Sequence, residues 1–180
     1  MKMHCFYISC LTSYISFLTS CLFLLAGCGY HMAGRGSHLP GGAKTIAIPV
    51  FSNKTFEPIV EEELTPAVIR EFMKDGRIEV MDSSRADVIL TGSVVSYTES
   101  PLSFDSNQNV LEYRITVTTQ LRLVRGPPSS ETLWEKDITT SAEYSVSSDV
   151  MSTKASKFLA LKEIARNLAE EATDRALWGW

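Results

Sequence analysis

The clearest pattern in the chain is an alternation of apolar and polar residues over residues 111–124. An alternation with a period of two predicts a β-strand that has one buried face and one solvated face. The polar face of this strand would carry Arg114, Thr116, Thr118 and Arg122, with Glu112 and Gln120 beside them. The face predicted to be buried carries Leu111, Tyr113, Ile115, Val117, Leu121 and Leu123.

Three other segments have the composition of strands, at residues 45–50, 87–98 and 132–144. A short run at residues 78–81 is a further candidate. The proline- and glycine-containing stretch at 125–130 predicts the turn before the strand at 132–144. The chain therefore contains four predicted principal strands.

Two segments have helical periodicity. The first, at residues 57–74, repeats apolar residues every four positions and ends at Asp75-Gly76, where Gly76 suits a left-handed cap. Pro66 lies inside it, so this helix either starts near Thr65 or is kinked there. The second helix is predicted over residues 153–178. The order β-α-β-β-β-α predicts an α+β fold. We expect a two-layer sandwich with two helices on one face of a mainly antiparallel four-stranded sheet.

The N-terminal segment has the order of an export signal. Lys2 is followed by a mostly apolar run at residues 15–26 and by small residues before Cys28. The sequence Leu-Ala-Gly-Cys at residues 25–28 resembles the lipobox of bacterial lipoproteins. We therefore expect residues 1–27 to be a cleaved lipoprotein signal peptide and Cys28 to carry acyl chains, palmitate among them. The alternatives are an uncleaved transmembrane anchor over residues 5–26 and a structural role for Cys28.

Residues 28–43 hold five glycines and one proline, which is typical of a flexible tether. A single domain over residues 44–180 is expected to follow. Gly29 stands where the enterobacterial sorting rule places Asp in lipoproteins retained at the inner membrane. Because Gly29 stands there in place of Asp, the sequence favours an outer-membrane location with a lipid anchor.

Charge and composition exclude several functions. Without residues 1–27 the chain keeps 16 of its 17 Lys and Arg residues and all 21 acidic residues, a formal charge of −5. This balance argues against a nucleic-acid partner, which selects a basic surface. The only histidines in the mature chain are His31 and His38, both in the predicted tether, where a general base would be poorly held. We expect no enzymatic activity, metal site or cofactor.

Two surfaces are candidates for binding. The polar strand face with Arg114, Thr116, Thr118 and Arg122 can exchange hydrogen bonds with a partner, although a solvated antiparallel face has the same pattern. The segment at residues 100–109 is long for a hairpin and carries Phe104, an apolar residue of the kind that functional loops expose. A disordered connection is the alternative for this segment.

Several of these features together resemble the lipopolysaccharide-assembly lipoprotein family LptE. The residues concerned are Cys-Gly-Tyr-His-Met at 28–32, Asn-Val-Leu-Glu-Tyr-Arg at 109–114, and the order of elements. The resemblance implies a lipoprotein that sits inside the outer-membrane barrel LptD, helps it to fold and binds lipopolysaccharide. It also implies basic contacts in the long loop and near the last helix. The loop has no Lys or Arg here, so Lys154 and Lys157 are the candidates for lipopolysaccharide contact.

An alternative resemblance comes from the first strand. Residues 45–55, and the entry Ala-Asp-Val-Ile-Leu-Thr-Gly at 86–92, are also similar to envelope lipoproteins of the CsgG and LpoB kind. These are secretion-channel subunits or activators of peptidoglycan synthases. The start at residues 28–30 and the Glu-Tyr pair at 112–113 favour the LptE family.

Overall fold

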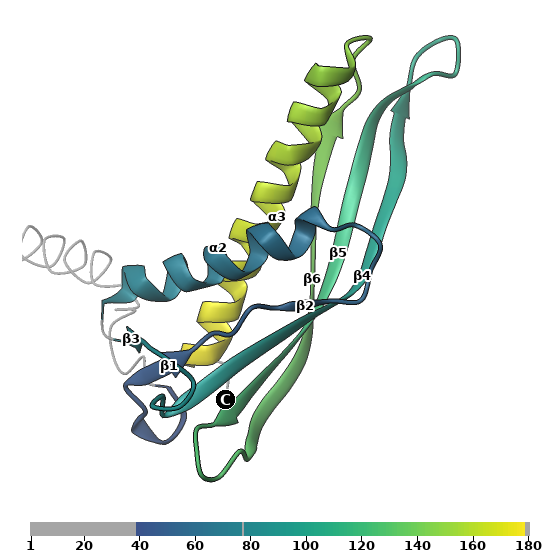
Figure 1. Cartoon of the computed structure of the whole chain (residues 1–180). Helices are drawn as coiled ribbons and strands as arrows, with labels where there is room; N and C mark the ends of the chain where they lie inside the picture. Colours follow the sequence, from purple (N-terminus) through teal and green to yellow (C-terminus); the bar gives the residue numbers. More distant parts are fainter. Residues whose placement is uncertain (1–38, 77, 179–180) are drawn as a thin grey trace, which may run out of the picture. The chain divides into compact units, whose positions relative to one another are not determined.

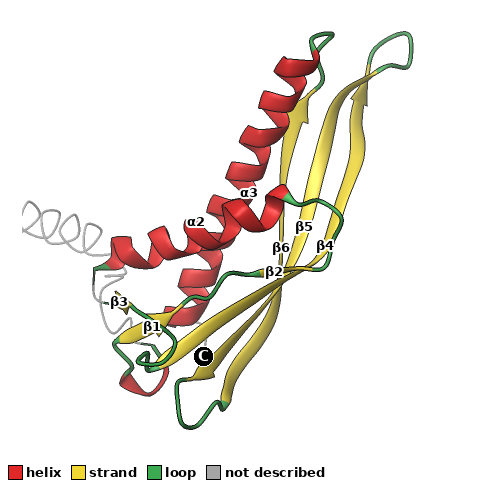
Figure 2. Ribbon diagram, viewed as in Figure 1, coloured by secondary structure: helices red, strands yellow, loops and turns green. Residues whose placement is uncertain are grey.

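The computed structural model describes residues 39–76 and 78–178, which fold as an α+β unit built on one sheet (Figure 1). Two helices pack with this sheet, and three of its strands are long (Figure 2). The elements are the 3-10 turn η1 (Pro40–Gly42), β1 (Thr45–Ala47), β2 (Ser52–Asn53), α2 (Ile59–Asp75), β3 (Glu79–Val80), β4 (Val88–Phe104), β5 (Val110–Arg125), β6 (Thr132–Ser145) and α3 (Val150–Trp178).

The sheet is six-stranded and mixed, which corrects the expected four-stranded, mainly antiparallel sheet. Its order is β3-β1-β4-β5-β6, and β2 pairs with β4 outside this path. β1 runs parallel to β3 and β4, and β2 runs parallel to β4, whereas β4, β5 and β6 are antiparallel neighbours. A parallel neighbour needs a crossover connection, which α2 supplies between β1 and β3. Strands of two residues such as β2 and β3 are too short to leave a periodic signal in the sequence.

The alternation predicted for β5 is confirmed over most of the strand. Ile115, Val117, Leu121 and Leu123 are completely buried. The two predicted residues nearest the hairpin turn differ: Tyr113 is only half-buried, and Leu111 is 44% exposed. β4 reaches Phe104, further than the expected end at residue 98, because it continues to pair with β5 through three register irregularities.

The two helices share the core with the sheet. α3 packs along β6 and β5, and α2 crosses α3 (Figure 1). The helix α2 is a single element from Ile59 to Asp75 with Pro66 inside it, so it does not start near Thr65. Pro66 and Glu62 are both exposed, so water can satisfy the Glu62 carbonyl that Pro66 cannot reach. Gly76 adopts the left-handed conformation expected of a C-cap.

The packed region begins earlier than residue 44. Leu39 is 1% exposed and belongs to the hydrophobic core, and Pro40 is also buried. Residues 39–43, expected in the tether, are therefore part of the folded domain. Burial of a single leucine side chain stabilises by about 1.5–3 kcal/mol, which explains why this short segment is held.

Thr119 interrupts the apolar face of β5. Its partners in the sheet register are Val94 and Ile138, its side chain is completely buried, and its hydroxyl has no hydrogen-bond partner among the described residues. We expect Thr119→Val to raise the free energy of unfolding by about 1 kcal/mol in urea denaturation, because it removes an unsatisfied polar group. Thr118→Val is the control, since Thr118 shares its hydroxyl with Thr139 on the other face. A loss of stability in Thr119→Val would show that the hydroxyl has a partner.

Candidate functional site

The face of the sheet opposite the core is uniformly polar. The pairing register places hydroxyl and charged side chains of three strands side by side. After the irregularity between Val94 and Ser96, the even-numbered residues of β4 from Ser96 to Ser100 pair with the polar residues of β5. We call this surface the polar sheet face. Its members are Thr91, Ser93, Ser96, Thr98 and Ser100 of β4, Arg114, Thr116, Thr118, Gln120 and Arg122 of β5, and Glu135, Asp137, Thr139, Ser141 and Glu143 of β6.

The charges of the polar sheet face are paired across strands. Arg114 Nη2 lies 2.7 Å from Glu143 Oε1, and Arg122 Nε lies 3.0 Å from Glu135 Oε2. The hydrogen bond from Arg122 holds the pKa of the Glu135 carboxyl below its usual value. The sheet register therefore neutralises both arginines and leaves a surface dominated by hydroxyl groups.

The structure brings four of the five predicted partner-surface residues together. Arg114, Thr116, Thr118 and Arg122 all belong to the polar sheet face. Phe104 lies apart from them, at the end of the β4–β5 hairpin, and its side chain is 55% exposed.

The β4–β5 turn is ordered, in contrast to the alternative of a disordered connection. Asp105 Oδ1 accepts hydrogen bonds from the backbone N–H groups of Asn107 and Asn109, both at 2.8 Å, and Asp105 Oδ2 accepts one from Asn109 Nδ2 at 2.9 Å. The hydrogen bond from the Asn109 side chain lowers the pKa of Asp105. Asp105 therefore acts as the centre of a tight turn between two long strands.

Exposed apolar side chains gather at this end of the domain. The hairpin turn and the start of α3 lie at the same end in Figure 1, and Val146 N donates to Leu111 O at 2.8 Å between them. We call the group the apolar tip. It consists of Leu102, Phe104 and Leu111 from the hairpin and Val150 and Met151 from α3.

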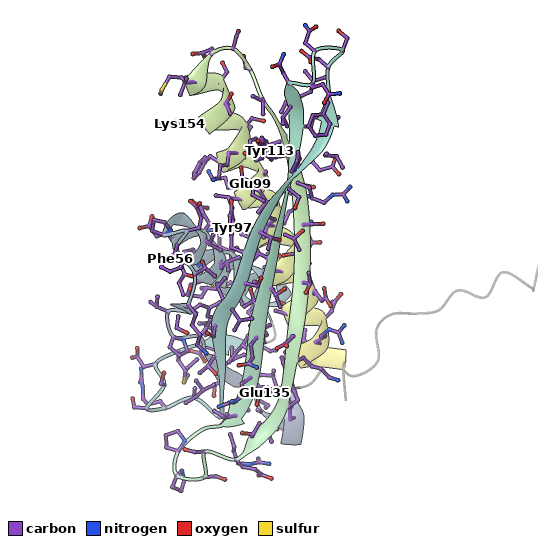
Figure 3. The ribbon with its side chains drawn as sticks, turned by 90° about the vertical axis from the view of Figure 1, so that its right-hand side faces the viewer. Phe56, Tyr97, Glu99, Tyr113, Glu135 and Lys154 are labelled. Atoms are coloured by element: carbon purple, nitrogen blue, oxygen red, sulfur yellow. The ribbon has the colours of Figure 1, made fainter. Side chains whose placement is uncertain are left out.

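Lys154 lies in the first turns of α3, next to the apolar tip (Figure 3). The helix starts at a well-formed cap, in which Asp149 accepts hydrogen bonds from the N–H groups of Met151 and Ser152 at 3.2 and 3.0 Å. Lys154 is exposed and forms no ion pair with any described residue. Its ammonium group is therefore available to an external anion.

Lys157 has a different environment. Its Nζ lies 3.2 Å from Glu99 Oε2 and 3.3 Å from Glu57 Oε2, and it stands 5.6 Å from the centre of the Tyr97 ring. The hydroxyl groups of Tyr97 and Tyr144 donate to Glu99. We call these five residues the Lys157 cluster. It ties α3 to β4, β6 and the segment before α2. Tyr97 and Glu99 are labelled in Figure 3.

The pKa values within the cluster follow from these contacts. Burial acts to raise the pKa of Glu99, but hydrogen bonds from Tyr144, Lys157 and Tyr97 outweigh it and lower the pKa. Burial acts to lower the pKa of Lys157, but its interactions with Glu99 and Tyr97 raise it. Burial raises the pKa of Tyr97 to about 12. At neutral pH the cluster therefore holds an ionised Glu99, a charged Lys157 and neutral tyrosines.

Lys157→Met is expected to lower the free energy of unfolding by about 1–2 kcal/mol at pH 7. This is less than the 3–5 kcal/mol for breaking a fully buried pair, because the side chains of Lys157 and Glu99 remain 28% and 27% exposed. Folding lowers the pKa of Glu99. The stability that its ionised carboxylate contributes is therefore present above pH 4.5, the ordinary pKa of the group, and is lost as the pH falls through the lower folded pKa. The difference between wild type and variant should therefore shrink on acidification. Urea denaturation from pH 3 to 7 measures it. Lys154→Met is the matched control, and an equal loss in both variants would contradict the assignment.

Other chemistry is sparse among the described residues. Residues 39–76 and 78–178 contain no group of three His, Cys, Asp or Glu side chains that could hold a metal ion. None of the helices in this part of the chain is long and apolar enough to cross a membrane. The predicted acylation site Cys28, and His31 and His38, lie outside the described residues.

Comparison with known sequences gives one family. The family model for LptE, described as lipopolysaccharide-assembly, matches residues 43–176. A search of curated protein sequences found no match. The matched segment includes β1 to β6, α2 and most of α3.

Solved structures share the fold at low sequence identity. A lipoprotein from Caulobacter crescentus is 13% identical with a TM-score of 0.53, and the alignment covers 73% of this chain and 88% of that one. A minor lipoprotein from Acinetobacter baumannii is 11% identical with a TM-score of 0.50, covering 76% and 92% of the two chains. A hypothetical protein from Chlamydia trachomatis is 8% identical with a TM-score of 0.51, covering 76% and 98%. These similarities concern the fold alone.

Proposed function

The chain belongs to the LptE lipopolysaccharide-assembly family, and we propose that it is an outer-membrane lipoprotein that partners the LptD β-barrel and binds lipopolysaccharide without catalysing a reaction. The observation that carries the proposal is the family match over residues 43–176, which spans nearly the whole described domain. The match favours this role over that of a secretion-channel subunit or a peptidoglycan-synthase activator.

The polar sheet face supports the partnership with a barrel. The interior wall of an outer-membrane barrel is polar, so a partner inside it must offer hydrogen bonds. Thr116 and Thr118 offer hydroxyl groups there, and Arg114 and Arg122 already have carboxylate partners. A polar wall can therefore cover both arginines without leaving them unpaired, whereas Asp137, which forms no ion pair with a described residue, would need a donor from the wall.

The region around Lys154 supports contact with lipopolysaccharide. That ligand combines negatively charged groups with acyl chains, and Lys154 is an exposed cation next to the exposed side chains of the apolar tip. Lys157 is held by Glu57 and Glu99, so we assign the contact to Lys154 and a positioning role to Lys157. Lys157 would fix the start of α3 so that Lys154 faces the ligand.

We expect Lys154→Glu to weaken lipopolysaccharide binding by about 5–10-fold, because an exposed charge contact contributes about 1 kcal/mol and its reversal adds repulsion. Titration of labelled lipopolysaccharide against the purified lipoprotein in detergent measures the dissociation constant. Lys136→Glu provides the control, since Lys136 is also an exposed lysine and lies on β6. Equal binding by wild type and Lys154→Glu would remove Lys154 from the site.

The partnership is tested by a detergent pull-down of the native lipoprotein from its own envelope, followed by mass spectrometry. A stoichiometric outer-membrane barrel of LptD size is the expected result. Recovery of a penicillin-binding protein, or of the lipoprotein alone as a ring oligomer, would contradict the proposal. Substitution of Thr116 and Thr118 by lysine should reduce recovery of the barrel, because two charges would then face the polar wall without partners.

A further inference from the structure

A pocket of about 220 Å³ opens on the polar sheet face, where the short strand β2 joins β4. Its lining comes from β2, β4 and β5 and from Lys54, the residue directly after β2. We call it the Lys54 pocket. The lining residues are Ser52, Lys54, Thr91, Gly92, Ser93, Gln120 and Arg122.

The sheet register builds the Lys54 pocket from side chains on one face. Ser52 pairs with Ser93, and Ser93 pairs with Gln120, so these three residues form one row across β2, β4 and β5. Thr91 and Arg122 form the next row, where the Thr91 hydroxyl donates to Arg122 O at 3.2 Å. Residues paired across strands point to the same face of a sheet. The pocket is therefore part of the polar sheet face.

Contacts on both sides of β2 fix the backbone that carries Lys54. The Lys54 N–H donates to Val94 O at 2.9 Å. Before β2, the side chain of Phe51 is 2% exposed and packs against Gly92, where a Cβ atom would lie 2.5 Å from the Phe51 ring. The side chain of Lys54 itself is exposed. The fold therefore holds this lysine at the edge of the pocket and leaves its ammonium group accessible.

The lining offers positive charge and hydrogen-bond donors and contains no acidic residue. Lys54 forms no ion pair with any described residue, whereas Arg122 is paired with Glu135 on β6. The Ser93 hydroxyl is buried and has no hydrogen-bond partner in the described part of the chain. An anion that accepts hydrogen bonds is therefore the complementary ligand, with Lys54 as its cation.

A partner that covers the polar sheet face must deal with this charge. Lys54 is hydrated while it is exposed, but a polar wall laid over the face would displace that water, and a lysine buried without a partner opposes docking. A carboxylate on the wall removes the difficulty, because it pairs with the ammonium group. The hydroxyl groups of Ser52 and Ser93 and the Gln120 amide can then donate to its oxygens.

We propose that the Lys54 pocket binds the side-chain carboxylate of an aspartate or glutamate on the lumen wall of the barrel partner. The proposal rests on the proposed function, in which the polar sheet face meets that wall. Lys54 supplies the charge, and the donors of the lining fix the direction from which the carboxylate enters. Charge pairs at an interface fix the register of docking and reject wrong partners. The pocket would therefore set the position of the domain against the wall.

The test is zero-length cross-linking of the complete lipoprotein in its complex with the barrel, purified in detergent. A carbodiimide joins a lysine amine to a carboxylate in contact with it; an amide forms, and the reagent takes up the water that is lost. Mass spectrometry of the digested complex should give a peptide that joins Lys54 to an aspartate or glutamate of the barrel. Lys54→Arg is the matched control, since it keeps the charge and the barrel but cannot form the amide.

The contribution of the pair is measured by competition. A tagged variant and untagged wild type are made in the same cells, and the barrel recovered with the tag is quantified. Lys54→Glu should reduce this recovery by about 30-fold or more, as loss of one member of a buried charge pair does. Lys162→Glu makes the same change on an exposed lysine of α3 and should reduce it by less than about 3-fold. Lysine in place of the cross-linked barrel carboxylate should restore recovery with Lys54→Glu.

Several results would overturn the proposal. Lys54 may not cross-link only to Glu135 or Asp137 of its own chain, nor stay uncoupled while other lysines are joined to the barrel. A carbohydrate adduct on Lys54 would place lipopolysaccharide in the pocket, and equal losses with Lys54→Glu and Lys162→Glu would remove the specific role of Lys54. Failure of the proposed function looks different, because no barrel then accompanies the wild-type lipoprotein and the proposal falls with it.

Discussion

Cys28→Ala is expected to remove the protein from the outer membrane almost completely. Each buried acyl methylene contributes about 0.8 kcal/mol to membrane binding, so one chain holds a protein marginally while several chains hold it stably. Alanine offers no thiol for acylation, so all of this stabilisation would be lost. Separation of inner and outer membranes, together with incorporation of labelled palmitate, measures the effect. Both signals should fall to background.

Cys21→Ala is the matched control, since Cys21 lies inside the predicted signal peptide and should be dispensable. A Cys28→Ala protein that keeps its outer-membrane location would exclude acylation as the anchor. Retention in a membrane without palmitate would instead indicate that residues 5–26 remain as an uncleaved span. The domain itself should be unaffected, because its packing starts at Leu39.

The parts of the fold with a repeated pattern could be predicted from the sequence. The alternation along β5 identified its buried residues, among them Ile115 and Leu123, because a single face of this strand meets the core. The same alternation placed Arg114 and Arg122 together on the opposite face. Helix α2 was predicted for a similar reason, since its apolar repeat faces the core through Leu64 and Phe72.

The parallel strands and the ion pairs could not be predicted in this way. β2 and β3 contain two residues each and depend on neighbours that are distant in the sequence. The irregularity between Val94 and Ser96 changes which side chains of β4 face the core, and it turns Glu99 toward Lys157. The expectation drawn from the family resemblance therefore treated Lys157 like Lys154. The distinction between the two lysines requires the three-dimensional contacts of Glu57 and Glu99.

Gly126→Ala is expected to destabilise the domain more than any other single change discussed above. Gly126 is buried directly after the end of β5, and its N–H donates to Asp87 O at 2.7 Å. A Cβ atom at this position would lie 1.9 Å from the backbone oxygen of Ala86, a contact that only movement of the backbone can relieve. The Asp87 carboxylate also accepts hydrogen bonds from the N–H groups of Lys44 and Thr45, so the movement would disturb β1 as well as β4.

We expect a loss of about 2–4 kcal/mol in the free energy of unfolding, a large part of the 5–15 kcal/mol typical of a domain. The midpoint of thermal unfolding should fall by roughly 5–15 °C. Gly76→Ala is the control, because Gly76 has a positive φ of 69° but open space around its Cβ position. Its cost should be about 1 kcal/mol, from backbone strain alone. Both variants are measured by thermal and by urea denaturation. If Gly126→Ala costs no more than Gly76→Ala, the contact between Gly126 and Ala86 can relax without disturbing the junction of β1, β4 and β5. A larger effect at Gly126 would identify that junction as the place where the N-terminal strand is held to the long hairpin.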